Sequence, residues 1–233
     1  MANTHFSFKQ FLIHQDLCAM KVCTDACLFG AWSAQQMKTY NHGVENILDI
    51  GTGTGLLSLM LAQQDIGNIH AIEIDASAIK QARENFTASP WRDRLKGIHG
   101  NVIGYHNDIL YDFIICNPPF YEGELRSPGR ERNAAMHDSE LILQQVLKAI
   151  KNNLSPGGYA SLMLPYSRKR DVEEISIKEG LYCIIRTDIR HTMKHSFFRT
   201  FVLLSAIKKD SVINEVITIL DDDGVYTNSF SDL

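Results

Sequence analysis

Residues 45–55 read ENILDIGTGTG, an apolar run that ends in three glycines at alternate positions. Glycine has no Cβ, so the backbone can turn tightly after the run and approach a ligand closely. The next stretch, LLSLMLAQQ at 56–64, reads as a helix whose first N–H groups are free to meet a ligand. A strand, a glycine turn and a helix in this order indicate a nucleotide-like ligand.

The same alternation of short apolar runs and amphipathic runs continues along the chain. Further strands are predicted at 69–74, 94–100, 111–116, 159–165, 181–189 and 197–207, and helices at 76–86, 139–153 and 167–180, with a polar loop at about 121–138. This pattern predicts an α/β fold, a Rossmann-like doubly wound sheet of seven mostly parallel strands with the last strand antiparallel. Residues 213–233 are expected to add an edge strand and a hairpin.

Composition narrows the class of protein. The 233 residues fit one large α/β domain, and 23 Lys plus Arg against 27 Asp plus Glu give a net charge of −4, so nucleic acid would have to bind a local patch. No run approaches the roughly 18 apolar residues that cross a bilayer, so no membrane partner and a cytoplasmic location are expected. Five cysteines without a CxxC pair, and His191 and His195 without a nearby general-base Glu, indicate no metal site. A monomer is favoured.

Glu73 follows the glycine turn by about 20 residues, at the end of the second strand. A carboxylate there can accept hydrogen bonds from both hydroxyls of a ribose. Dinucleotide sites favour a small residue at the last position of GxGxxG, but Leu56 occupies that position, which weakens a hydride-transfer reading.

DIGTGTG, Glu73 and the alternation together resemble the class I S-adenosylmethionine-dependent methyltransferases over residues 46–206. The resemblance implies S-adenosylmethionine as cofactor, with Asp49 at its methionine end, Gly51, Gly53 and Gly55 lining it, Glu73 on the ribose and Asn101 at the adenine edge. It also implies that 46–233 is the catalytic domain, with residues 1–45 as a helical lid segment of the same single domain.

The fourth strand ends in NPPF, residues 117–120, which resembles the motif of methyltransferases that modify conjugated nitrogen atoms. An exocyclic amine on adenine is a poor nucleophile because its lone pair is delocalised into the ring. The side-chain oxygen of Asn117 and the carbonyl of Pro118 can accept from its two N–H bonds and favour a pyramidal nitrogen. Pro118 and Pro119 stiffen the backbone, and Phe120 can stack on the base. Asn117 would also border the cofactor.

Two cationic segments are candidates for holding RNA. Arg126, Arg130 and Arg132 follow NPPF directly, and residues 186–199 carry Arg186, Arg190, Lys194 and Arg199 beside two aromatic residues. With the stretches at 8–33 and 224–227, these features resemble bacterial methyltransferases of the valine-tRNA type, which act on the exocyclic nitrogen of the adenosine after the anticodon. That resemblance implies a tRNA substrate, and that Lys21, Thr24 and Asp25 close over the cofactor.

Three alternatives remain open from the sequence. NPPF also suits a glutamine methyltransferase acting on a release factor, although 45 residues leave little room for the helical domain those enzymes carry. A guanine-N2 methyltransferase of ribosomal RNA is often built with a duplicated domain. A non-catalytic RNA-binding scaffold would have no reason to keep the glycine turn, Glu73, Asn117 and Phe120 together.

Overall fold

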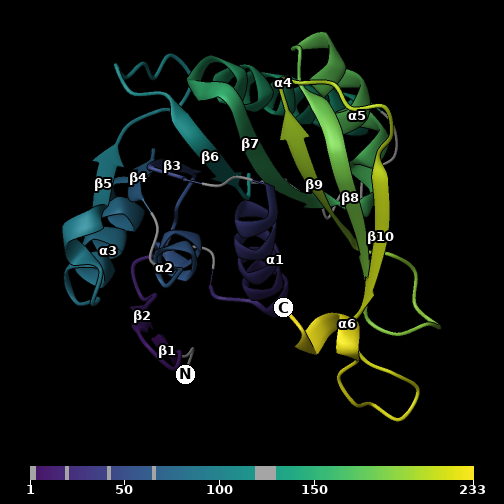
Figure 1. The fold of residues 1–233 in the computed structure, drawn as a ribbon, viewed down its shortest axis with the longest axis horizontal. Helices are drawn as coiled ribbons and strands as arrows, with labels where there is room; N and C mark the ends of the chain where they lie inside the picture. The colour runs from purple at the N-terminus through teal and green to yellow at the C-terminus, as the bar shows by residue number, and fades with distance from the viewer. Residues whose placement is uncertain (1–3, 19–20, 41–42, 65–66, 119–129) are drawn as a thin grey trace.

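The computed structural model describes residues 4–18, 21–40, 43–64, 67–118 and 130–233, with residues 130–139 described by their backbone alone. Within these residues an eight-stranded twisted sheet forms the centre of the molecule (Figure 1). Every neighbouring pair of strands is parallel except those of β9, which is antiparallel to β7 and β8. From edge to edge the strands are β10 (Ile213–Thr218), β8 (Tyr182–Arg190), β9 (Arg199–Ser205), β7 (Leu154–Pro165), β6 (Tyr111–Cys116), β3 (Asn46–Ile50), β4 (Asn68–Glu73) and β5 (Leu95–His99).

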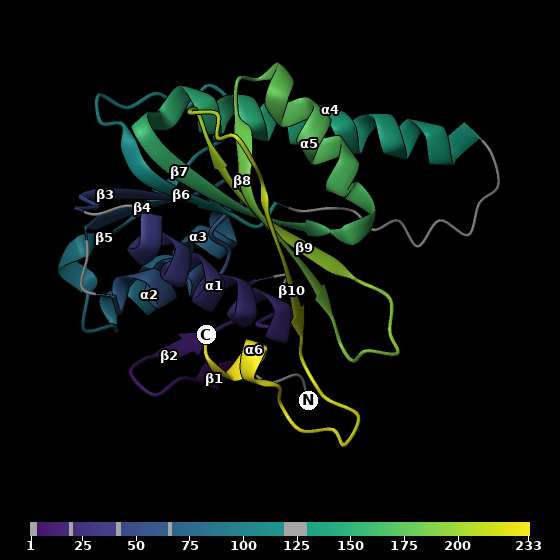
Figure 2. The same cartoon turned by 45° about the vertical axis from the view of Figure 1, so that its right-hand side comes forward.

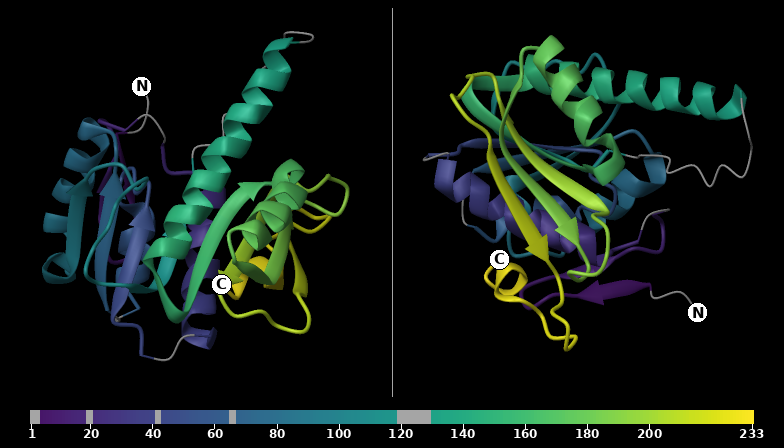
Figure 3. Two further views of the ribbon diagram at one scale, coloured as in Figure 1. Left: turned by 90° about the horizontal axis from the view of Figure 1, so that it is seen from above. Right: turned by 90° about the vertical axis from the view of Figure 1, so that its right-hand side faces the viewer.

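Helices cover both faces of the sheet (Figure 2). One face carries α1 (Thr24–Tyr40), α2 (Leu56–Ala62) and α3 (Ala76–Thr87), and the other carries α4 (Arg130–Asn153) and α5 (Lys169–Lys178). The start of α4 extends well beyond the rest of the molecule (Figure 3). The remaining elements are short: the hairpin strands β1 (His5–Ser7) and β2 (Leu12–His14), the 3-10 turns η1 (Arg92–Arg94) and η2 (Tyr166–Arg168), and α6 (Asn228–Ser231).

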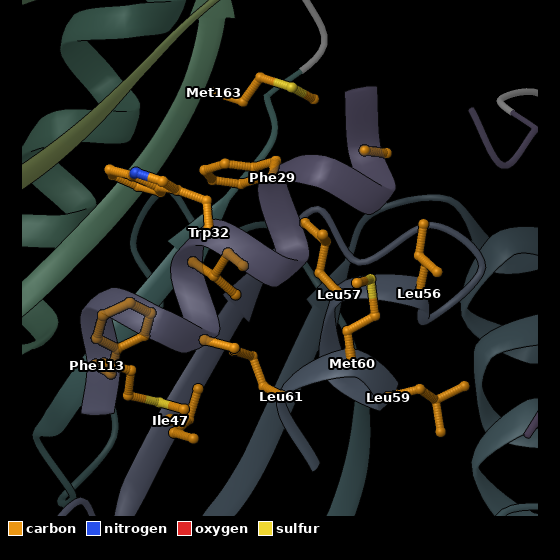
Figure 4. Packing of buried hydrophobic residues seen from close by; sticks show 14 of the residues in the cluster. Phe29, Trp32, Ile47, Leu56, Leu57, Leu59, Met60, Leu61, Phe113 and Met163 are labelled. Carbon is orange, nitrogen blue, oxygen red and sulfur yellow. The ribbon is translucent and has the colours of Figure 1, made fainter. Parts of the chain in front are cut away.

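The larger core lies between the sheet and the first three helices. Trp32 and Phe29 of α1 are fully buried (Figure 4). Their rings meet that of Phe201 in β9 at centroid distances of 5.5 and 5.1 Å. Helices α1 and α2 approach closely at Gly30, where an added Cβ would lie 2.4 Å from the sulfur of Met60. Burial of this much apolar surface is the main stabilising contribution to the fold.

The predicted α/β class and the doubly wound sheet are confirmed, with three differences in detail. The main sheet has eight strands, because Ile213–Thr218 pairs in parallel with β8 as the edge strand expected from the chain end. Residues 4–18 include a small β-hairpin that the helical lid prediction did not contain. The polar loop predicted to run to residue 138 is wrong from Arg130 onward, since α4 already begins there.

Candidate active site

Three strands deliver the candidate residues to one edge of the sheet. Ile50, the last residue of β3, pairs with Ile72 of β4 on one side and with Cys116 of β6 on the other. The next residues, Gly51, Glu73 and Asn117, therefore leave the sheet side by side at its carboxyl edge. The backbone N–H of Gly51 donates to the carbonyl of Ile72 at 2.9 Å, which fixes the start of the glycine turn. Ligands of doubly wound sheets bind at such an edge.

Asp49 lies under the glycine turn with no exposed surface. Its Oδ2 accepts hydrogen bonds from the hydroxyls of Thr52 at 2.6 Å and Ser58 at 2.7 Å. Burial raises the pKa of Asp49 to about 6, because desolvation of the charge outweighs those two hydrogen bonds. Among the described residues no group donates to its buried Oδ1. A buried acceptor without a donor fits a site whose ligand brings a cationic or N–H group.

The three glycines of the turn have positive φ angles, but they face different surroundings. Gly51 (φ 72°) and Gly53 (φ 54°) have no described atom within 4 Å of the position a Cβ would take, so the space above them is open to a ligand. At Gly55 (φ 85°) the same position lies 2.5 Å from the ring of Phe86 in α3. Gly51 and Gly53 thus leave room for the predicted lining role, which stays a prediction, whereas the surroundings of Gly55 show that it is required for packing against α3.

Glu73 joins the glycine turn to the start of α3. Its Oε2 accepts from the N–H of Gly53 at 3.0 Å, and its Oε1 accepts from the N–H groups of Ile74 at 2.8 Å and Asp75 at 3.0 Å. An ionised carboxylate has about four acceptor positions, so capacity for a hydroxyl group remains. Asp75 caps α3 by accepting from the N–H of Ala78. Ile74, beside Glu73, is 64% exposed, which the sequence did not single out.

Asn117 is partly exposed at the end of β6, and Pro118 behind it is buried. Within the described part of the chain, no hydrogen bond occupies the carboxamide of Asn117. It lies level with Gly51 across the β3–β6 pair, which brings the predicted catalytic amide to the glycine turn. Pro119, Phe120 and Arg126 lie outside the described residues.

Asn101, the predicted adenine contact, follows β5 at the same edge and is exposed. Its Oδ1 accepts from the N–H of Ile103 at 2.9 Å, which forms a local turn. His99, the last residue of β5, contacts the carbonyl of Ile74 through Nε2 at 3.1 Å. The segment after β5 is therefore held against the end of β4, next to Glu73.

The N-terminal segment is fastened to α3 by two buried side chains that the sequence did not reveal as important. Asn85 accepts from the N–H of His14 at 2.9 Å and donates to the carbonyls of His14 and Thr54, both at 2.8 Å. Gln81, one helical turn earlier, accepts from the N–H of Leu17 at 3.2 Å. The available signal was a polar pair at i and i+4 within the apolar face of α3.

Cys18, in the same segment, lies close enough to Glu73 to feel its charge. Burial raises the pKa of Cys18 to about 11, and the charge of Glu73 raises it further while that of Lys21 lowers it. Lys21 donates from Nζ to the carbonyl of Gln15, and Gln15 accepts from the N–H of Val22 at 2.8 Å. The ammonium of Lys21 therefore already has a backbone partner within the N-terminal segment, and its role in closing over the cofactor stays a prediction.

Thr24 begins α1, and the next residue, Asp25, ties that helix to β9. Its Oδ2 accepts from Nε of Arg199 at 2.9 Å, and its Oδ1 accepts from the N–H of Ala26. Burial alone would raise the pKa of Asp25, but hydrogen bonds from Cys23 and Arg199 outweigh it and hold the pKa below its ordinary value. The side chains of Asp25 and Arg199 are 15% and 25% exposed. Arg199, predicted to contact RNA, is thus part of an intramolecular ion pair.

The other predicted RNA-binding residues differ in how free they are. Lys194 is exposed and pairs with exposed Asp222 at 3.1 Å, a weak interaction at the surface. Arg186 is taken up by Glu173 and Asn214. Arg190 donates to Thr218 and to the sulfur of Met193. Arg130 and Arg132 lie in the first turn of α4, where the structure describes the backbone alone.

Solved structures resemble this fold over most of the chain. A predicted O-methyltransferase from Agrobacterium tumefaciens superposes with a TM-score of 0.64 at 14% identity, over 88% of this chain and 93% of that one. An S-adenosylmethionine-dependent methyltransferase from Clostridium acetobutylicum gives a TM-score of 0.61 at 13% identity, over 78% and 92%. With the glycine turn, buried Asp49 and Glu73, the fold is that of the class I S-adenosylmethionine-dependent methyltransferases.

Sequence comparison gives the family. A family model described as the methyltransferase small domain matches residues 34–179. A tRNA1(Val) (adenine(37)-N6)-methyltransferase from Phocaeicola vulgatus is 37% identical over 230 residues, which cover 99% of this chain and 95% of the relative. An enzyme of the same name from Aliivibrio salmonicida is 38% identical over 232 residues, 99% and 96%. The chain belongs to the methyltransferase small-domain family, together with these tRNA methyltransferases.

Proposed function

We propose that this enzyme methylates N6 of adenosine 37 in a valine tRNA, the reaction named for its relatives. Their names support this substrate over the glutamine of a release factor or a guanine of ribosomal RNA. The observation that carries the chemistry is the exit of Asn117 and Pro118 from β6 beside the glycine turn that follows β3.

The residues at the carboxyl edge suit S-adenosylmethionine. The unpaired Oδ1 of Asp49 suits an N–H or cationic group, Gly51 and Gly53 leave room for the ligand, and Glu73 can accept a ribose hydroxyl. We propose that Lys21 and Thr24 border this space on the side of the N-terminal segment. Asn101 would border it on the side of β5. When bound, the cofactor supplies an electrophilic methyl group.

The chain's own contribution is to bind and reshape the amino group. The carboxamide oxygen of Asn117 and the carbonyl of Pro118 accept from its two N–H bonds, so the nitrogen becomes pyramidal and its lone pair leaves conjugation. Pro118 has a fixed φ and no N–H, which holds its carbonyl in place before the base arrives. Phe120 would stack on the base, and Pro119 would stiffen the turn between them. The base has to leave its stack to reach this edge.

RNA is proposed to follow the cations of this edge, Arg126, Arg130 and Arg132 after β6, with Lys194 beyond β8. Support comes from α4, which carries Arg130 and Arg132 away from the molecule at its catalytic end (Figure 3). We extend the proposal to a single domain, since residues of 1–45 such as Phe11, Ile13 and Trp32 share one buried core with 46–233.

We also propose that the enzyme is a monomer, because one chain provides all the site residues named above. A cytoplasmic location is part of the same proposal. In the described part of the chain no helix is long and apolar enough to cross a membrane, and no group of three or more His, Cys, Asp or Glu is placed to hold a metal ion.

The test is incubation of the enzyme with radiolabelled S-adenosylmethionine and either total bacterial RNA or total protein, taken from cells that lack the enzyme. Nucleoside analysis is expected to show label in N6-methyladenosine, and an unmodified valine tRNA transcript is expected to be sufficient as substrate. Label in protein or in methylguanosine would refute the assignment. An Asn117→Ala variant is the matched control, since it should bind the cofactor and transfer little label.

A further inference from the structure

Four aromatic rings gather at the catalytic edge of the sheet, beyond β7 and between β8 and β9. They belong to Tyr166, His191, Phe197 and Phe198, and we name them the aromatic platform. The N–H of Tyr166 donates to the carbonyl of Phe198 at 3.1 Å, which joins the turn after β7 to the loop before β9. The β8–β9 loop extends beyond the sheet on the side toward which α4 also projects (Figure 2).

The platform is built from two ring pairs, one tilted and one stacked. The rings of Tyr166 and Phe197 lie 5.1 Å apart at 37°, and those of His191 and Phe198 lie 4.4 Å apart and almost parallel, at 2°. Tyr166, Phe197 and Phe198 are partly exposed and His191 is exposed, so none of the four is buried in the core. Aromatic rings on a protein surface are often binding elements when they gather in this way.

A cation lies against three of these rings. Nζ of Lys169 is 4.4 Å from the centre of the Tyr166 ring, and the guanidinium of Arg190 is 5.3 Å from that of Phe197. Arg199 approaches Phe198 at 5.9 Å. Such contacts orient the cations against the rings.

Arg190 differs from the other two cations in its charge balance. Lys169 lies 3.5 Å from Asp188, and Arg199 is paired with Asp25. The partners of Arg190 are the neutral Thr218 and Met193, and no described carboxylate lies within ion-pair distance of it. Its charge is therefore available to a phosphate group of a bound nucleic acid.

The platform stands close to the proposed methyl acceptor site. Cys116 of β6 pairs with Leu162 of β7, so Asn117 is level with Met163. Tyr166 follows Met163 by three residues and comes directly after Pro165, the last residue of β7, so it lies just beyond the strand end at the same edge of the sheet. Arg190 ends β8, which points in the same direction as β6 and β7.

We propose that the aromatic platform stacks an unpaired base of the RNA substrate next to the base that is methylated, while Arg190 holds a phosphate group of the same segment. Rings provide a surface for any unpaired base, and cations follow the backbone, which is how single strands are bound without sequence readout. The inference rests on the proposed function, because it names how that substrate is held.

The experiment measures methylation kinetics and RNA binding with an unmodified valine tRNA transcript. Phe197→Ala should raise KM and the Kd for tRNA by about tenfold, because a base–aromatic stack is lost, and should leave kcat within about twofold. Phe197→Tyr keeps a ring and should behave as the wild type. Tyr40→Ala is the matched control, since Tyr40 is also a half-buried ring paired with another ring (Tyr159, 5.8 Å) but lies at the end of α1. It should change neither constant.

Salt dependence separates the roles of the ring and the cation. Arg190→Gln should reduce the slope of log Kd against log salt concentration by about one unit, whereas Phe197→Ala should leave the slope unchanged. An unpaired RNA oligonucleotide should compete for tRNA binding better than a duplex of the same length, and Phe197→Ala should remove that preference.

Two results would overturn the inference. They are an unchanged KM in Phe197→Ala, and equal losses in Phe197→Ala and Phe197→Tyr, which would make Phe197 a packing residue. Cofactor affinity and thermal unfolding of each variant show whether the fold survives. If the wild-type enzyme methylates no tRNA, the proposed function fails; if it does and Phe197→Ala matches it, only the platform fails.

Discussion

Asp49 is expected to lower the stability of the protein while it serves the cofactor. Burial raises the pKa of its carboxyl from 3.8 to about 6 in the folded state. The folded state therefore holds a proton that the unfolded state has released between about pH 4 and pH 6, and stability falls as the pH rises through this window. A shift of this size corresponds to roughly 3 kcal/mol above pH 6, at about 1.36 kcal/mol per unit.

Asp49→Asn removes that cost because the amide keeps the shape of the side chain and cannot ionise. At pH 7.5 its free energy of unfolding should exceed that of the wild type by up to about 3 kcal/mol, and near pH 4 the two proteins should be equal. Cofactor binding should weaken at least about tenfold at pH 7.5, because a charge aimed at a cationic ligand is lost. In the wild type, cofactor affinity should also fall as the pH drops below 6.

Urea denaturation at pH 4 and 7.5 measures the first effect, and calorimetric titration with S-adenosylmethionine over the same range measures the second. Asp223→Asn, a substitution at an exposed carboxylate in the C-terminal turn, is the control and should change neither. Should Asp49→Asn destabilise the protein equally at both pH values, the buried charge is not the source of the cost and the argument is refuted.

Three further substitutions test the site. Asn117→Ala should lower kcat by about a hundredfold and leave the cofactor Kd unchanged, because the lost hydrogen-bond acceptor acts in the transition state. Single-turnover rates and calorimetric Kd values measure the two effects. Equal losses in both would show that Asn117 has a structural role. Gly53→Ala and Gly224→Ala should each lower the free energy of unfolding by about 1 kcal/mol in urea, because both glycines have a positive φ and open surroundings. Only Gly53→Ala should also weaken cofactor binding. An equal effect of both variants on binding would argue against a lining role for Gly53. Arg199→Met leaves Asp25 without its guanidinium partner and should cost about 1–3 kcal/mol in the free energy of unfolding at pH 7; because the pairing lowers the pKa of Asp25, this cost should shrink as the pH falls through that lowered pKa. In Arg199→Met, the slope of log Kd for RNA against log salt concentration should not change. A lower slope would show that Arg199 contacts RNA.

Most of the fold was predictable because the residues of most strands and helices follow a local apolar periodicity. The apolar run before Gly51, the helix stop at Gly180 and the run FVLLS of β9 all have patterns that survive without tertiary context. The start of α4 was missed because its first turns are polar and project from the molecule, so no apolar stripe marks them. The N-terminal hairpin was missed because each of its strands has only three residues.

The candidate site divides in the same way. Asp49, Gly51, Glu73 and Asn117 follow directly from strand ends, and parallel strands bring their ends together whatever the rest of the chain does. The role of Gly55 depends on Phe86, 31 positions away in sequence, and the ion pair of Arg199 depends on Asp25, 174 positions away. No local pattern in the sequence contains such a partner. For this reason Arg199 was predicted to bind RNA, although its charge is paired with Asp25 in the folded chain.

Asn85 has a consequence that reaches beyond its own helix. The carboxamide of Asn85 bonds both the N–H and the carbonyl of His14, and it also bonds the carbonyl of Thr54. The β1–β2 hairpin and the glycine turn are therefore held by the same side chain. Ordering either partner lowers the entropy still to be lost by the other, which couples them thermodynamically. Binding of S-adenosylmethionine should therefore slow amide hydrogen exchange at His14 and Leu17, whose N–H groups donate to Asn85 and Gln81 of α3.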